Sequence, residues 1–235
     1  MSEAQSRTRY GFLDAYRGLC VLVMVVYHGA FDLAVYGYIP LSLLINSVMN
    51  VIHPIFAGSF VLMSGATCRF SRNNLKNAVV LGLTAAGVSL GTRLFTPDMF
   101  ISFGILHFFA SATLIYSLLG RLFERAEKIL APVFAAVFAV LYTVFPVNIQ
   151  TSGLAFLGFP TAKYYSGDYY PIIPWIFLFF VGTYTGGLIK NGRMPKALYS
   201  LSCPPLEKIG RHSLLIYIVH QPVLYGAVTL LSKIK

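Results

Sequence analysis

Residues 13–36 read LDAYRGLCVLVMVVYHGAFDLAVY, an apolar run long enough to cross the hydrocarbon core of a bilayer as one α-helix. Four polar residues stand in this run: Asp14, Arg17, His28 and Asp32. Positions eleven or eighteen apart return to nearly the same face of an α-helix, because each residue turns by about 100°. Arg17 and His28 are eleven apart and Asp14 and Asp32 are eighteen apart, so all four share one stripe. Lipid would not tolerate this stripe, which must face a bundle interior or a wet cavity.

The composition of the whole chain is that of a membrane protein. Of its 235 residues, 57% are hydrophobic and 11% are charged, about half the charged fraction of a soluble domain. Such a chain cannot cover a globular surface with polar side chains, so we expect its outer solvent to be the lipid bilayer. The net charge of +10 would indicate nucleic-acid binding in a soluble protein. Here we attribute it to basic residues that flank membrane spans, and we expect no nucleic-acid partner.

Seven apolar segments predict the fold. Each is close to the length that crosses a bilayer as a helix, and no internal repeat or linker divides the chain. We therefore expect an all-α, polytopic membrane helix bundle of about seven transmembrane helices, with residues 1–235 forming a single domain. The segments are 13–36, 50–67, 76–94, 101–119, 129–146, 171–189 and 212–231.

The basic residues predict the orientation of these spans. Alternating sides along the chain gives one side fourteen of the eighteen Lys and Arg residues, and basic residues gather on the cytoplasmic side of membrane proteins. This predicts a cytoplasmic N-terminus, an external C-terminus and a multi-pass protein of the plasma (inner) membrane. The predicted cytoplasmic residues are Arg7, Arg9, Arg17, Arg69, Arg72, Lys76, Arg121, Arg125, Lys128, Lys190, Arg193, Lys196, Lys208 and Arg211; the external ones are Arg93, Lys163, Lys233 and Lys235.

The longest external loop is predicted at about 146–170 and is rich in tyrosine. Such residues are typical of the aromatic belt at a membrane interface. They would also suit an aromatic platform for a sugar-like substrate. Both interpretations remain open at this point.

His28 is the strongest candidate for chemistry. It lies about 16 Å along the helix axis from Arg17, close to the middle of the bilayer. Asp32 is one turn further, where its carboxylate could orient the imidazole and raise its basicity, as in a catalytic pair. The alternative is a structural hydrogen bond between helices. Ionisable groups inside a membrane are costly and commonly functional, so we predict catalytic roles for His28 and Asp32.

Other histidines could line the same cavity. His107 and His220 lie inside predicted spans and are candidate substrate-binding residues, and His53 starts a span beside Pro54. The sequence contains neither an HExxH motif nor a Cys/His cluster, so no metal site is predicted.

Two further arginines follow the second span. Arg69 and Arg72 are three apart, and on a helix such a pair would point the same way and form a fork for phosphates. Their alternative role is to set topology and contact lipid headgroups. With Arg17 at the cytoplasmic mouth of the first helix, they are the candidate cofactor-binding residues.

Five segments follow one another in a recognisable order: FLDAYRGL at 12–19, VYHGAFDL at 26–33, FGILH at 103–107, GRHS at 210–213 and HQP at 220–222. In this order they resemble bacterial proteins with a heparan-α-glucosaminide N-acetyltransferase-type catalytic domain. The spacing Arg17-x10-His28 followed by Arg69-x-x-Arg72 is also similar to the signature of type 3 membrane acyltransferases.

The resemblance implies a transmembrane O- or N-acetyltransferase. It implies an acyl group, chiefly acetyl, moved from cytoplasmic acyl-CoA to a sugar or cell-envelope glycan on the far side. Acetyl-CoA would be the donor, His28 would be the catalytic histidine, and the arginines would be linked to CoA. Two other classes fit an Arg, His and Asp stripe: a proton-coupled transporter of small molecules or lipids, and a non-catalytic scaffold of the same family. We see no inverted repeat or pair of broken helices of the kind that many transporters have.

Overall fold

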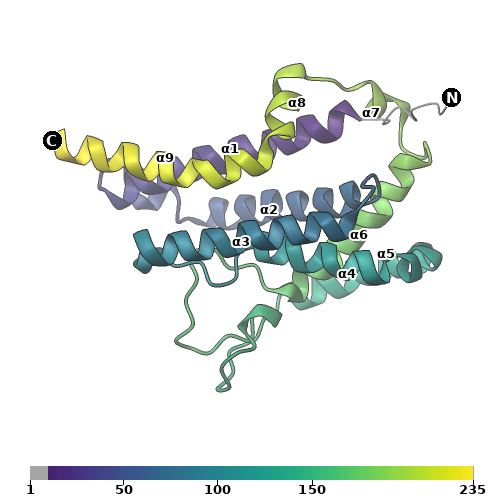
Figure 1. The fold of residues 1–235 in the computed structure, drawn as a ribbon, viewed down its shortest axis with the longest axis horizontal. Helices are drawn as coiled ribbons and strands as arrows, with labels where there is room; N and C mark the ends of the chain where they lie inside the picture. The colour runs from purple at the N-terminus through teal and green to yellow at the C-terminus, as the bar shows by residue number, and fades with distance from the viewer. Residues whose placement is uncertain (1–9, 235) are drawn as a thin grey trace. The chain divides into compact units, whose positions relative to one another are not determined.

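The computed structural model describes residues 10–234. All regular secondary structure within that range is helical. The predicted positions of Arg7, Arg9 and Lys235 lie outside the described residues. Figure 1 shows the long helices, which match the seven predicted segments within a few residues at most ends. They are α1 Gly11–Val35, α2 Ser47–Cys68, α3 Asn74–Phe95, α4 Ile105–Arg125, α5 Glu127–Tyr142, α6 Ile172–Lys190 and α9 Ser213–Ile234; the short ones are α7 Lys196–Ser200, α8 Pro204–Arg211 and the 3-10 turns η1 Leu41–Leu43, η2 Pro97–Met99 and η3 Ala155–Leu157.

Six helices in the described part of the chain are long and apolar enough to cross a membrane: α1, α2, α3, α4, α6 and α9. The prediction of an all-α, multi-pass membrane protein is thus confirmed. The segment predicted at 129–146 is α5, which has 16 residues. At 1.5 Å per residue it is about 24 Å long, shorter than a typical hydrocarbon core of about 30 Å.

The described chain divides into two compact units. The first unit holds the residues up to 57 and those from 194 onward, and so contains α1, α7, α8, α9 and the start of α2. The second unit is 58–193, from the rest of α2 to α6. The assignment of 1–235 to a single domain stays a prediction.

Glycines allow α1 and α8 to cross at backbone contact in the first unit. A Cβ on Gly18 would overlap the carbonyl oxygen of Leu206, and a Cβ on Gly210 would overlap that of Asp14. Small residues at such crossings replace side-chain packing by close approach of the two helix backbones, as is common in membranes. This crossing fixes the start of α1 against the segment that leads into α9.

Helices α1 and α9 lie side by side and run in the same direction (Figure 1). Near their starts Arg17 donates a hydrogen bond to Ser213 Oγ at 3.1 Å, and further along Tyr36 and Thr229 are hydrogen-bonded at 2.9 Å. Two helices that cross the bilayer in the same direction must be separated by an odd number of other crossings. Between α1 and α9, the apolar helices α2, α3, α4 and α6 would supply four crossings. The parallel course of α1 and α9 therefore favours a fifth crossing by α5, although α5 is short. Which end is cytoplasmic stays a prediction.

In the second unit, the long connection from α5 to α6 is held against the start of α4. The Asp168 carboxylate accepts a hydrogen bond from the backbone N–H of Ile105 at 2.8 Å and so caps the N-terminus of α4. Tyr169 donates to the Ala155 carbonyl at 2.7 Å, and burial raises the pKa of Tyr169 to about 12, so that the phenol keeps its proton. Tyr169 therefore helps to order this loop, and the role of the loop's tyrosines as belt or platform stays a prediction.

Candidate functional site

The polar stripe of α1 faces protein, as predicted. Arg17 reaches Ser213, the His28 ring contacts the His220 ring, and the Asp32 carboxylate binds the Gln221 side chain. All three partners belong to α9. Asp14 and Asp32 are both buried. The stripe is therefore the seam by which α1 packs against α9 within the first unit.

The two imidazoles are stacked edge to face across this seam. The ring centroids of His28 and His220 are 5.2 Å apart, with an interplanar angle of 62°. The Nδ1 of His220 lies 2.7 Å from the Tyr217 carbonyl oxygen, so Nδ1 carries the proton and donates it there. The other nitrogen, Nε2, is then a lone-pair acceptor in the neutral ring. His220 is 9% exposed, and its Nε2 is buried without a hydrogen-bond partner among the described residues.

His28 itself makes ring contacts but has no hydrogen bond to any described residue. Its ring lies 6.0 Å from that of Tyr27, which in turn lies 5.1 Å from the His53 ring. Two of the other histidines predicted to gather near His28 therefore do so, His220 directly and His53 through Tyr27. The nitrogens of His28 remain available to a ligand.

Asp32 does not form the predicted hydrogen bond to His28. The Nε2 of Gln221 donates to both carboxylate oxygens of Asp32, each at 3.1 Å. The amide oxygen of Gln221 is buried and has no partner within residues 10–234. Gln221 was not among the predicted site residues, although an amide directly after a histidine in an apolar helix was a usable signal.

No three His, Cys, Asp or Glu side chains converge as metal ligands in the described part of the chain. His28 and His53 both contact Tyr27, and His220 contacts His28 and Tyr217. An imidazole in its neutral form can accept a proton.

His107, in the second unit, has a different environment. Its Nδ1 accepts from the backbone N–H of Gly104 at 3.2 Å, and its Nε2 lies 3.2 Å from Ser89 Oγ. Ser89 donates its own proton to the Ile101 carbonyl at 2.6 Å, so it accepts from His107. Both ring nitrogens are therefore satisfied inside the protein, where they join α3 to the start of α4. A role for His107 in substrate binding stays a prediction.

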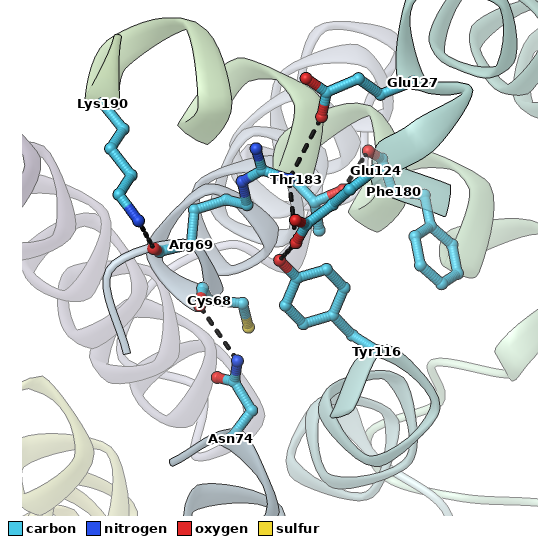
Figure 2. Close-up of polar contacts among 9 residues, drawn as sticks. All are labelled: Cys68, Arg69, Asn74, Tyr116, Glu124, Glu127, Phe180, Thr183 and Lys190. Atoms are coloured by element: carbon cyan, nitrogen blue, oxygen red, sulfur yellow. Dashed lines mark hydrogen bonds and ion pairs between the residues drawn. The ribbon is translucent and has the colours of Figure 1, made fainter. Parts of the chain in front are cut away.

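Arg69 is the centre of an ion-pair cluster in the second unit (Figure 2). Its Nη1 lies 2.9 Å from a Glu124 oxygen and 3.2 Å from a Glu127 oxygen, and its side chain is 12% exposed. Tyr116 also donates to Glu124, at 2.5 Å. The cluster ties the end of α2 to the end of α4 and the start of α5. Neither glutamate was among the predicted site residues, although the whole chain has only eight acidic residues and two of them fall here.

The helical fork expected from Arg69 and Arg72 is not formed. Helix α2 ends at Cys68, and both arginines lie in the connection to α3. Asn74 donates to the Cys68 carbonyl at 3.1 Å and Lys190 to the Arg69 carbonyl at 3.5 Å, which satisfies the end of α2 (Figure 2). Arg72 is exposed and no described residue pairs with it. The roles of Arg17, Arg69 and Arg72 in binding CoA stay predictions.

Comparison with known proteins gives a family for this site. No curated protein and no solved structure matches the chain significantly. The family described as "Heparan-alpha-glucosaminide N-acetyltransferase, catalytic" matches residues 9–222, a span that includes the first turns of α1 and the His220–Gln221 pair of α9. The match confirms the resemblance seen in the sequence: the chain belongs to the heparan-alpha-glucosaminide N-acetyltransferase catalytic family of transmembrane acetyltransferases.

Proposed function

We propose that this protein transfers an acyl group, with acetyl as the expected one, from cytoplasmic acyl-CoA to a sugar or glycan on the external face of the plasma (inner) membrane. The observation that carries the proposal is His28. It is an imidazole inside a membrane-spanning helix, no described residue hydrogen-bonds to it, and a second imidazole lies beside it. A histidine with a purely structural role in a membrane protein is expected to have its nitrogens paired, as those of His107 are.

The chemistry that suits this arrangement is general base catalysis. His28 takes the proton from the hydroxyl or amine of the acceptor as that group attacks the thioester carbonyl. The new C–O or C–N bond forms, the C–S bond breaks, and the departing thiolate of CoA takes the proton back from His28. In a two-step variant His28 attacks first and carries the acetyl group before the acceptor removes it.

The donor side of the proposal concerns three arginines. Arg17, Arg69 and Arg72 are the predicted ligands of the CoA phosphates, because guanidinium groups bind phosphate oxygens through paired hydrogen bonds. Arg72 is exposed, while Arg69 is already paired with two carboxylates. Each arginine is therefore best tested by its own substitution.

A transfer assay tests the proposed function. The purified protein in lipid vesicles is given acetyl-CoA labelled in the acetyl group and glucosamine, the probe suggested by the printed name of the family. We expect labelled N-acetylglucosamine to form together with free CoA in equal amounts. A lack of transfer, with glucosamine uptake that follows an imposed proton gradient, would instead identify a proton-coupled carrier.

The predicted orientation is tested by reporters fused after residue 235. Fourteen of the eighteen basic residues fall on the predicted cytoplasmic side, so we expect a periplasm-dependent phosphatase reporter to be active there. A phosphatase that is silent at this position, with a cytoplasmic reporter active in its place, would reverse the orientation of the C-terminus.

A further inference from the structure

The polar atoms that α1 and α9 leave without a partner are hydrogen-bond acceptors. Tyr217 fixes one of them: because its carbonyl accepts the Nδ1 proton of His220, the lone pair of His220 lies on Nε2. Asp32 fixes the other: because both of its oxygens accept from the amide nitrogen of Gln221, the amide oxygen points away from Asp32. Nε2 of His220 and Oε1 of Gln221 are both buried and unpartnered among the described residues.

Two such atoms on consecutive residues call for a physical explanation. A buried acceptor without a donor is unfavourable, and native proteins contain few of them. Here both side chains reach toward the same face of α1, since their contacts on it are His28 and Asp32, one turn apart. Pro222 follows directly and cannot donate a backbone hydrogen bond to the preceding turn, which loosens the helix at this point. The acceptors are therefore placed for a ligand that brings hydrogen-bond donors.

The polarity of the site distinguishes the two substrates of an acyltransferase. The reacting carbonyl of a thioester has only acceptor atoms, and it would need donors from the protein. The reacting hydroxyl or amine of a sugar, with its neighbouring hydroxyls, is rich in donors. A site that offers a histidine lone pair and an amide oxygen beside His28 suits the sugar.

We propose that His220 and Gln221 form the acceptor subsite of this protein, in which they receive O–H or N–H donors of the sugar whose nucleophile His28 deprotonates. In this arrangement Asp32 is a positioning residue, because it holds the Gln221 amide so that oxygen faces the sugar. The inference rests on the proposed function, and it adds the residues that recognise the sugar to the base that activates it.

The first test compares His220→Leu with His212→Leu in the vesicle assay. His212 is a matched control, since its Nδ1 also lies 2.9 Å from a backbone carbonyl one turn back, that of Lys208, but its ring is exposed. We expect His220→Leu to raise the KM for glucosamine about 10- to 100-fold, because a donor of the bound sugar is left unpaired. The KM for acetyl-CoA should stay within about twofold. His212→Leu should change neither constant, and His220→Gln, which keeps an acceptor, should restore part of the loss.

The second test uses Asp32→Asn, which preserves the shape of the site if His220→Leu does not fold. An asparagine can donate to Oε1 of Gln221, so the amide can turn and present its NH2 group to the sugar. We expect the KM for glucosamine to rise by about tenfold while the KM for acetyl-CoA is unchanged. Adding Gln221→Leu to Asp32→Asn should have little further effect, because both changes remove the same acceptor.

A binding measurement separates this inference from the proposed function. In the His28→Ala background, glucosamine should still raise the melting temperature, and adding His220→Leu should abolish that rise. A folded His220→Leu protein with normal glucosamine KM and normal glucosamine binding would overturn the acceptor subsite and leave the acyltransferase standing. A wild-type protein that binds glucosamine through His220 but transfers no acetyl group would overturn the proposed function and leave the subsite standing.

Discussion

The Arg69 cluster of the second unit and the histidine pair of the first unit both place ionisable side chains within a membrane protein, but they differ in how these groups are satisfied. The guanidinium of Arg69 lies within ion-pair distance of two carboxylates, one of which also accepts from Tyr116, although Nη1 makes no well-directed hydrogen bond to a described residue. His28 meets no hydrogen-bond partner among the described residues, and Nε2 of His220 is buried and unpaired. The charge of the first arrangement is balanced within the protein, whereas the second presents acceptors that have no donor among the described residues.

This difference separates a structural role from a chemical one. Ion pairs between helices stabilise a bundle when their hydrogen bonds are complete, and removing one partner leaves an uncompensated charge. A base must instead keep a lone pair free for the proton that it will take. Substitutions in the Arg69 cluster should therefore act on stability, while substitutions at the histidine pair should act on turnover.

The largest expected effect is that of His28→Ala on acyl transfer. Losing the base should reduce the rate of transfer about 10²–10⁴-fold, and more if an acyl-histidine forms. The labelled acetyl assay measures this rate, and size-exclusion chromatography with acetyl-CoA binding checks that the variant is folded. His212→Ala is the matched control, since that imidazole is exposed and lies at the end of α8. Near-normal transfer by His28→Ala would show that the histidine pair, like the Arg69 cluster, has only a structural role.

The next effect is that of Arg69→Met on stability. The change leaves Glu124 and Glu127 without their shared cation, so we expect the free energy of unfolding to fall by about 2–3 kcal/mol, less than for a fully buried pair because Glu124 is partly exposed. Denaturant unfolding in detergent measures it. Arg72→Met, which removes an exposed arginine, should be close to neutral. Equal stability of the two variants would show that the Arg69 cluster contributes little.

A smaller effect is expected from Arg72→Ala on the binding of acetyl-CoA. Loss of one charge-assisted contact to phosphate should weaken binding about tenfold and leave stability unchanged. Isothermal titration with CoA and with desphospho analogues measures this loss. Arg17→Lys should keep the charge but lose the paired geometry, and so should be intermediate. Unchanged affinity in both variants would leave these arginines with the topological role alone.

The smallest effect is that of His107→Ala on stability. The change breaks one hydrogen bond to the start of α4 and one to Ser89. We expect a loss of about 1 kcal/mol in the free energy of unfolding, with transfer close to that of the wild type. Thermal unfolding measures the loss of stability, and the transfer assay on the same sample measures the remaining activity. A loss of transfer comparable to that of His28→Ala would place His107 with the chemical residues.

Hydropathy was enough to predict the long helices, because a span must be apolar over its whole length. It misplaced α4, predicted at 101–119 and found at Ile105–Arg125. Gly104 precedes the helix, and the helix continues beyond its apolar part through Arg121 and Arg125. Helices α7 and α8 were missed for the same reason: Lys196–Ser200 and Pro204–Arg211 are short and contain no apolar run.

The site was predictable to the extent that one helix determines it. The stripe of α1 follows from helical periodicity alone, and its contacts with α9 confirm it. The partner of Asp32 did not follow, because the sequence analysis considered only neighbours on the same helix. Gln221 lies 189 residues away along the chain, and its pairing with Asp32 depends on which helices pack together. The glutamates around Arg69 were missed for the same reason, since they come from α4 and α5.

The pairing of α1 with α9 has a consequence for how the protein is made. At about 5–20 residues per second of translation, Gln221 leaves the ribosome roughly 10–40 s after Asp32, which lies 189 residues earlier. Through that interval α1 is already in or near the membrane with a carboxylate and an arginine whose partners on α9 have not been synthesised. Something other than α9 must shelter the stripe until then, whether the insertion machinery or an earlier helix. A ribosome that stalls before α9 would release a chain whose α1 lacks the α9 contacts of Arg17, His28 and Asp32.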